Sequence, residues 1–188
     1  VESLAERAWR RFGRVDLLFN NAGVGLAKPV SETTLNDWRW VLGVNLWGAI
    51  HGIAAFLPRL EAQGGQSRIV NTASAAGFLS EPYMGAYSVS KHAVVILSET
   101  LHKELAARSS PVGVTILCPA FFPTGITGSE RVRPPGLRSP GGLSPGAAAA
   151  PAISLFIRCI PSGDLRERPP LSKVNPLPRK ARWRPSSA

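Results

Sequence analysis

The apolar residues of the chain form short continuous runs that alternate with longer stretches repeating every three or four positions. The short runs are Val15–Phe19, Ser67–Thr72 and Val112–Leu117. Apolar runs that do not alternate with polar residues are typical of strands covered on both faces, as in parallel sheets. These segments are therefore predicted to be strands of one sheet.

Three longer stretches have the spacing of helices. Val1–Phe12 is amphipathic and stops at Gly13, Thr34–Asp37 begins a helix that continues to about Leu60, and Tyr87–Arg108 forms the third. The apolar stripe of the second helix is made by Leu35, Trp38, Leu42, Asn45 and Ala49. Because strands and helices alternate, the sequence predicts an α/β fold with a parallel sheet and right-handed crossovers.

The pattern ends near Gly128, where prolines become frequent and the periodicity disappears. Residues 130–188 contain 11 of the 17 prolines, with 11 basic and 3 acidic residues, whereas residues 1–129 contain 11 basic and 9 acidic residues. The net charge of +10 therefore belongs almost wholly to the C-terminal part. We predict one domain over residues 1–137 and a mostly disordered basic tail over residues 138–188.

Composition narrows the class of protein. With 188 residues, of which 44% are hydrophobic and 18% charged, the chain can form a soluble globular domain. Cys118 and Cys159 lack the spacing of a zinc site or a disulfide framework, so we expect no metal and a cytoplasmic location. No uninterrupted apolar run reaches the roughly 20 residues of a membrane span, so no membrane association is expected.

Polar side chains follow the ends of all the predicted strands. Asn20–Gly23 comes after the first, Ser74 after the second and Pro119–Thr124 after the third. Tyr87 and Lys91 begin the helix behind the second strand, four residues apart and therefore on one helical face. Open parallel sheets bind ligands at the carboxyl ends of their strands, so these groups are expected to converge on one rim.

Each candidate also has a purely structural interpretation. Asn45 suits a hydrogen-bonded core residue, Ser74 a small turn residue, Tyr87 a packed ring and Lys91 a solvated helix residue. Ser74 lacks the nucleophile-elbow pattern G-x-S-x-G, and no histidine offers an evident triad partner. Only the combination of these residues favours a catalytic site.

The ordered set of motifs resembles the short-chain dehydrogenase/reductase family over about residues 1–137. The set comprises NNAG at 20–23, Asn45 in VNLWG, Ser74 in IVNTAS, Tyr87 and Lys91 in YxxxK, and SERVRP at 129–134, which is similar to a loop in some members. The resemblance implies a partial Rossmann fold with a doubly wound parallel sheet. It also implies NAD(P)-dependent hydride transfer between the nicotinamide and a small alcohol or carbonyl substrate.

The resemblance implies catalytic roles for four residues. Tyr87 would exchange a proton with the substrate oxygen, and Ser74 would hold that oxygen by a hydrogen bond. Lys91 would lower the pKa of Tyr87 and bind the nicotinamide ribose. Asn45 would fix a water molecule that links Lys91 to solvent.

The resemblance also assigns cofactor contacts beyond Tyr87 and Lys91. Asn20, Ala22 and Gly23 match the cofactor-side turn of the family, where small residues allow close backbone approach. Phe122 and Thr124 belong to PAFFPT, which matches the family's PGxVxT-like segment beside the nicotinamide, although Ala120 and Phe122 depart from that pattern. The sequence does not distinguish NAD from NADP.

The glycine-rich turn that holds a pyrophosphate in dinucleotide folds does not precede NNAG. The resemblance therefore implies that three strands and their helices are missing before Val15–Phe19, and that the tail replaces the last strand and helix. Val15–Phe19 would then lie at an open apolar edge. We expect the chain by itself to bind NAD(P) weakly and to show little or no activity.

Other interpretations concern the tail and the assembly. Charge and a stacking ring favour nucleic-acid binding at Arg179, Lys180, Arg182, Trp183 and Arg184. No fold signature accompanies these residues, so no specific nucleic acid is expected; the abrupt change near Arg138 also fits an extension read in a shifted frame. Members of the family are commonly dimers or tetramers built partly on the helices that carry Asn45 and Tyr87, so the resemblance also implies a homo-oligomer.

Overall fold

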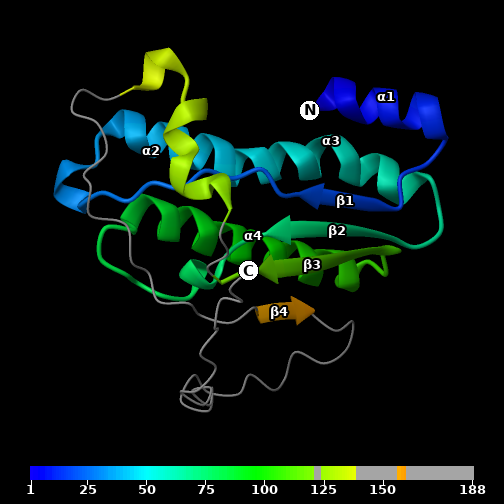
Figure 1. Ribbon diagram of the computed structural model, residues 1–188. Helices are drawn as coiled ribbons and strands as arrows, with labels where there is room; N and C mark the ends of the chain where they lie inside the picture. Colours follow the sequence, from blue (N-terminus) through cyan, green and yellow to red (C-terminus); the bar gives the residue numbers. More distant parts are fainter. Residues whose placement is uncertain (121–123, 139–155, 160–188) are drawn as a thin grey trace, which may run out of the picture.

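The computed structural model of the chain describes residues 1–120, 124–138 and 156–159 (Figure 1). The helices are α1 (Glu2–Phe12), α2 (Leu35–Leu42), α3 (Gly48–Ala62) and α4 (Gly85–Ala107). The strands are β1 (Leu17–Asn20), β2 (Ser67–Thr72), β3 (Val112–Cys118) and β4 (Phe156–Cys159). Shorter helical turns are η1 (Val30–Glu32), η2 (Gly43–Trp47), η3 (Ala75–Gly77), η4 (Gly125–Val132) and η5 (Pro135–Leu137).

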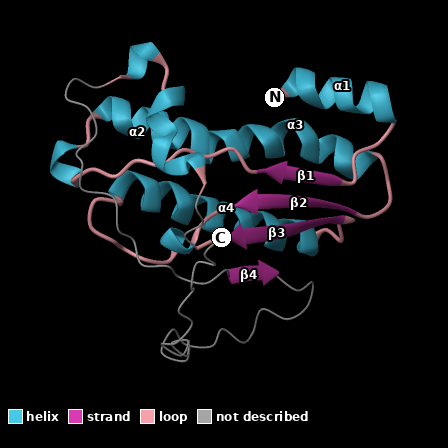
Figure 2. Ribbon diagram, viewed as in Figure 1, coloured by secondary structure: helices cyan, strands magenta, loops and turns pink. Residues whose placement is uncertain are grey.

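The strands form one sheet in the order β1-β2-β3-β4 (Figure 2). β1 and β2 pair in parallel, as do β2 and β3, with Leu18 opposite Ile69 and Ile69 opposite Val114. This confirms the α/β class and the strands predicted from the apolar runs. β4 pairs antiparallel to β3; it was not predicted, because the sequence of residues 138–188 has no periodic strand signal. The rest of the predicted tail, from residue 139, lies outside the described residues.

The long helices α3 and α4 pack on the same face of the sheet. Ile69 and Val114, which are opposite each other in the register, share a buried cluster with Phe56 of α3 and Leu105 of α4. α1 joins this cluster through Ala5, which is fully buried. Burial of each large aliphatic or aromatic side chain stabilises the fold by roughly 1.5–3 kcal/mol. The cluster therefore fixes α3 and α4, the second of which carries Tyr87 and Lys91, against the strands.

β1 differs from the prediction that its apolar run is covered on both faces. Leu18 packs against the core cluster, whereas Leu17 is 56% exposed and Phe19 is 59% exposed. Among the strands that the structure describes, β1 lies at the end of the sheet and pairs with β2 alone. An apolar strand at an open edge is a template for pairing with other chains, as the sequence predicted for this segment.

One continuous helical stretch, Leu35–Ala62, contains α2, η2 and α3, and it begins where the sequence predicted. The Thr34 hydroxyl accepts a hydrogen bond from the Asp37 backbone, and the Asp37 carboxylate accepts one from the Thr34 backbone, which completes a capping box. By its length, and by an 18-residue window with a mean hydropathy of 1.5, this stretch could cross a membrane, which the absence of a long uninterrupted apolar run did not predict. Phe56 and Leu60 of this stretch are buried in the sheet core, and 33% of the apolar window is buried.

The contact between α3 and β1 leaves no room for a side chain at Gly52. A Cβ at this position would clash with Oδ1 of Asn20, and Asn20 is held in turn because its Nδ2 donates to Oδ1 of Asn71 at 2.8 Å. We expect Gly52→Ala to lower the free energy of unfolding by about 1–3 kcal/mol, because either Asn20 or α3 must shift. Urea unfolding followed by circular dichroism measures this change.

Gly48→Ala is the matched control, because a Cβ at Gly48 meets open space on the same helix. Removing a glycine from a helix raises stability by up to about 1 kcal/mol when the new methyl group fits. A loss of stability at Gly48 equal to that at Gly52 would contradict the steric explanation.

Candidate functional site

The carboxyl ends of the parallel strands bring most of the predicted polar residues to one rim of the sheet. In the strand register Asn20 lies opposite Asn71, and Thr72 lies opposite Leu117. Ser74 caps η3 directly after β2, and Tyr87 lies in the first turn of α4. The convergence expected from the order of strands and helices is therefore present in the structure.

Ser74 and Tyr87 are adjacent, and both are more than nine-tenths buried. The Ser74 side chain acts on the phenol in the sense that lowers the pKa of Tyr87. Ser74 Oγ also accepts from the backbone nitrogen of Ala76 at 3.2 Å and donates to the carbonyl oxygen of Pro119 at 3.4 Å. Ser74 is thus both a turn residue and a hydroxyl group placed against the phenol of Tyr87.

Lys91 is a buried lysine, which excludes the interpretation as a solvated helix residue. It is 3% exposed, and its Nζ donates to the Thr72 carbonyl oxygen at 2.9 Å. The same Nζ lies 5.8 Å from the centre of the Tyr87 ring. Burial lowers the pKa of Lys91 to about 8, with Cys118 acting in the opposite direction. Lys91 therefore loses its charge at a pH where an exposed lysine would keep it.

Burial dominates the protonation of Tyr87. It raises the pKa of the phenol above its ordinary value, and the Ser74 side chain opposes this only in part. Lys91 is not among the causes of this shift, and its Nζ donates to the Thr72 carbonyl oxygen, so the lowering of the Tyr87 pKa by Lys91 stays a prediction. The phenol of Tyr87 is consequently neutral at physiological pH.

Asn45 lies in η2, a single π-helical turn between α2 and α3 that the sequence did not predict. Its Oδ1 accepts from the backbone nitrogen of Val24 at 2.8 Å, and its Nδ2 donates to the Val24 carbonyl oxygen at 3.0 Å and to Ser90 Oγ at 2.9 Å. Ser90 in turn donates to the carbonyl oxygen of Tyr87 at 2.7 Å. Asn45 therefore ties the loop after β1 to the first turn of α4. This is the buried, hydrogen-bonded role of the structural interpretation, at a position that also orients Tyr87.

We expect Asn45→Ala to lower the free energy of unfolding by about 1–3 kcal/mol, because the change leaves buried backbone groups of Val24 without their partner. Urea unfolding measures the loss. Asn36→Ala is the control, because Asn36 is partly exposed on α2 and accepts a hydrogen bond from the exposed Arg39 at 3.2 Å. Equal losses in the two variants would contradict the buried clamp.

The residues expected to contact a cofactor are placed unequally. Ala22 and Gly23 are exposed just beyond the end of β1, and a Cβ at Gly23 would lie 3.4 Å from Lys91 Nζ. Asn20 instead points under the rim, where it binds Asn71. Thr124 is exposed and caps η4, with Oγ1 accepting from Ile126 N at 3.4 Å, and Phe122 lies outside the described residues.

A buried series of hydrogen-bonded polar side chains lies beneath the site and was not predicted. From Asn20 it continues through Asn71, whose Nδ2 donates to Ser98 Oγ at 2.9 Å, and Ser98 donates to the Val94 carbonyl oxygen at 2.7 Å. Asn71 and Ser98 have no exposed surface. Polar residues inside the apolar patterns of β2 and α4 were the available signal, because buried polar groups need partners. This series of hydrogen-bonded side chains fixes the end of β1 relative to β2 and α4.

The chain is similar to known proteins of one family. The model of the short chain dehydrogenase family matches residues 1–134. The chain is 33% identical over 134 residues to the CLA biosynthesis dehydrogenase/reductase of Lactiplantibacillus plantarum, covering 71% of this chain and 47% of that protein. It is 36% identical over 115 residues to the NADP-dependent (R)-specific alcohol dehydrogenase of Lentilactobacillus kefiri, covering 61% of this chain and 46% of that protein.

A solved structure shows the same likeness. The short chain dehydrogenase/reductase of Burkholderia phymatum, in complex with NAD, is 51% identical with a TM-score of 0.74, covering 77% of this chain and 51% of that chain. The chain thus spans about half the length of these relatives. The likeness confirms both the resemblance read from the motifs and the predicted fold class, a partial Rossmann α/β sheet.

Proposed function

The chain belongs to the short-chain dehydrogenase family, and from this premise we propose that it carries the proton-transfer residues of an NAD(P)-dependent oxidoreductase acting on an alcohol or carbonyl compound. The observation that carries the proposal is the arrangement of Ser74, Tyr87 and Lys91. The Ser74 hydroxyl group acts on the Tyr87 phenol in the sense that lowers its pKa, and the buried ammonium lies 5.8 Å from the centre of the same ring. A hydroxyl pair backed by a buried cation suits a reaction in which an oxygen gains charge and a proton.

In the direction of reduction, Tyr87 donates its proton to the carbonyl oxygen of the substrate. Ser74 donates a hydrogen bond to the same oxygen and so positions it while its negative charge develops. A bound nicotinamide dinucleotide would supply the hydride for the carbonyl carbon, which with the proton from Tyr87 would complete the alcohol. The Tyr87 phenolate that remains is stabilised by the positive charge of Lys91 and regains a proton from solvent.

The residues at the rim suit the nicotinamide end of such a cofactor. Gly23 leaves space beside Lys91 Nζ, and an ammonium has three donors, of which one binds the Thr72 carbonyl oxygen. Lys91 can therefore also bind ribose hydroxyls. The cofactor is NAD or NADP: the Burkholderia phymatum relative holds NAD, and the Lentilactobacillus kefiri relative is NADP-dependent.

The pyrophosphate end has no counterpart in this sequence, because no glycine-rich turn precedes NNAG. We therefore expect the 188-residue chain to bind NADH and NADPH weakly. Titration of tryptophan fluorescence should show no saturation at low-micromolar concentrations of either nucleotide. Low-micromolar saturation would contradict this expectation, because it would show that the chain holds the dinucleotide without a glycine-rich turn.

A chimaera tests the proposed function directly. In it, the part of the Burkholderia phymatum relative that precedes the residue aligned with Val1 is joined to this chain. We expect the chimaera to saturate with NADH or NADPH and to reduce members of a panel of small ketones and aldehydes. Tight nucleotide binding without reduction of any member would contradict the proposed reaction.

Two further expectations accompany this function. The exposed sides of the helical layer include Trp47 at 52%, Val89 at 50% and Ile96 at 49% exposure, and apolar side chains exposed on neighbouring helices suit a second copy of the chain. We propose a homo-oligomer through this layer and a cytoplasmic location.

A further inference from the structure

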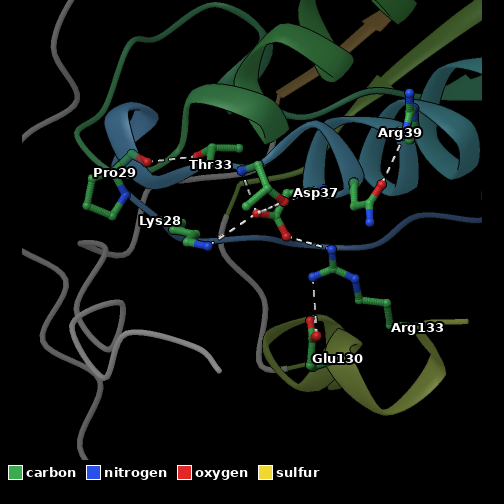
Figure 3. Close-up of polar contacts among 9 residues, drawn as sticks. Lys28, Pro29, Thr33, Asp37, Arg39, Glu130 and Arg133 are labelled. Carbon is green, nitrogen blue, oxygen red and sulfur yellow. Dashed lines mark hydrogen bonds and ion pairs between the residues drawn. The ribbon is translucent and has the colours of Figure 1, made fainter. Parts of the chain in front are cut away.

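A buried ion cluster that contains none of the proton-transfer residues lies at the start of α2 (Figure 3). At its centre is the Asp37 carboxylate, which is 1% exposed. Arg133 Nη2 lies 2.6 Å from Asp37 Oδ1, and Lys28 Nζ lies 3.2 Å from Asp37 Oδ2. The Thr34 backbone also donates to Oδ2, at 2.8 Å. Asp37 therefore joins three separate parts of the chain.

The charge of Asp37 is maintained despite its burial. Desolvation by itself would raise the pKa of this carboxyl group, but the hydrogen bonds from Thr34, Arg133 and Lys28 together hold the pKa well below its ordinary value. Removing one partner of a buried pair leaves an uncompensated charge. The cluster therefore holds its members together across the neutral pH range.

Arg133 is fixed on more than one side. It is 4% exposed, and its guanidinium lies 4.8 Å from the centre of the Trp40 ring. Its Nη1 lies 3.3 Å from Glu130 Oε1, three residues earlier. A planar guanidinium that stacks on a ring and binds a carboxylate has one preferred orientation. The segment that carries Arg133 is thereby placed over α2 (Figure 1, yellow).

The segment 124–138 has further contacts with the loop that follows β1. Gly25 N donates to Ser129 Oγ at 3.0 Å, and Leu137 packs against the cluster that contains Val24 and Trp40. The same loop contacts the residues just before α4, because Lys28 N donates to the Tyr83 carbonyl oxygen at 2.7 Å. The loop after β1, the segment 124–138 and the residues just before α4 therefore meet around the ion cluster.

We propose that the ion pair between Arg133 and Asp37, called the lock below, holds segment 124–138 in one position beside the site. Arg133 and Asp37 are therefore positioning residues. Segment 124–138 begins a few residues after β3, whose carboxyl end lies at the rim with Ser74 and Tyr87. That segment 124–138 would lie beside the substrate rests on the proposed function, whereas the ion pair that holds the segment does not depend on that function. Loops that border a binding site are commonly mobile, so a buried ion pair that anchors one of them has a measurable consequence.

Hydrogen–deuterium exchange on the full chain tests the lock at the level of peptides. In Arg133→Met, which removes the charge but keeps an apolar side chain against Trp40, residues 125–138 should exchange at least about tenfold faster, while β2 and β3 stay protected. Arg133→Lys keeps the charge without the planar fork, so we expect it to restore part of the protection. Arg138→Met is the matched control and should exchange like the wild type, because Arg138 is exposed at the end of the same segment.

A double-variant comparison assigns the effect to the pair. If Arg133 acts through Asp37, the double variant Asp37→Asn/Arg133→Met should exchange no faster in residues 125–138 than Arg133→Met alone. The lock would be overturned if the double variant exchanged faster than Arg133→Met by the factor that Asp37→Asn causes alone. Unchanged exchange in Arg133→Met would also overturn it. If Arg133→Met also loses protection in β2, the whole fold is destabilised and Arg133→Lys becomes the test. In Arg133→Lys, exchange faster than in the wild type must then be confined to residues 125–138. Exchange requires neither cofactor nor turnover, so failure here leaves the proposed function untouched, and an inactive chimaera leaves the lock untouched.

Discussion

Tyr87→Phe should lower the rate of carbonyl reduction by the chimaera about 10²–10⁴-fold, the range over which a positioned acid–base group accelerates reactions. Phenylalanine keeps the ring that is packed on α4 and removes only the hydroxyl group on which the Ser74 side chain acts. Nucleotide binding and the free energy of unfolding should change little. The rate of NAD(P)H oxidation at saturating carbonyl substrate measures the loss.

Tyr83→Phe provides a matched control, because Tyr83 is the only other tyrosine of the sequence. Tyr83 is 57% exposed, so removal of its hydroxyl group should leave the rate within about twofold of the wild type, as expected for a change that touches no reacting group. Unchanged turnover in Tyr87→Phe, or equal losses in both variants, would refute the role assigned to Tyr87.

The stability of the chain should rise with pH through the titration of Lys91. The pKa of Lys91 is about 8 in the folded chain against an ordinary value of 10.5, so the unfolded chain binds more protons between these values and stability increases there. The destabilisation is fully present below pH 8 and disappears towards pH 10.5. A difference of this size corresponds to about 3 kcal/mol in the free energy of unfolding.

Urea unfolding at several pH values from 7 to 10 measures this dependence. The range stops at pH 10 because the raised pKa of Tyr87 makes stability fall with pH once the unfolded phenol ionises. Lys91→Met should abolish the rise, whereas Lys103→Met, which removes an exposed lysine from the same helix, should retain it. A rise of the same size in Lys91→Met would show that another group is responsible.

Local sequence signals predicted the helices and most strands of the fold. They failed where burial or strand pairing depends on residues that are distant in the sequence. Thr34 and Asp37 mark the start of α2 because a capping box depends on adjacent residues alone. The exposure of Phe19 was not predictable in this way, because an apolar strand residue is buried only if another layer covers it. The antiparallel pairing of β4 is likewise a non-local contact in a proline-rich region without periodicity.

The candidate site shows the same division. The i, i+4 spacing of Tyr87 and Lys91 and their position after β2 follow from the sequence, and the structure places Tyr87 near Ser74 and Lys91 near the Tyr87 ring. The raised pKa of Tyr87 does not follow from spacing, because it depends on how much water the fold removes. Asp37 was recognised as a cap, but its pairing with Arg133 joins residues that are distant in sequence. No local pattern reports such a contact.

Transfer of an isotopic label tests the central claim, that these residues serve hydride transfer to a carbonyl carbon. The chimaera is incubated with NADH or NADPH carrying deuterium at the transferable position of the nicotinamide and with a carbonyl compound that it reduces. We predict one deuterium atom on the carbinol carbon of the alcohol product, and loss of this product in Tyr87→Phe. Nucleotide oxidation without label in the alcohol would contradict the account.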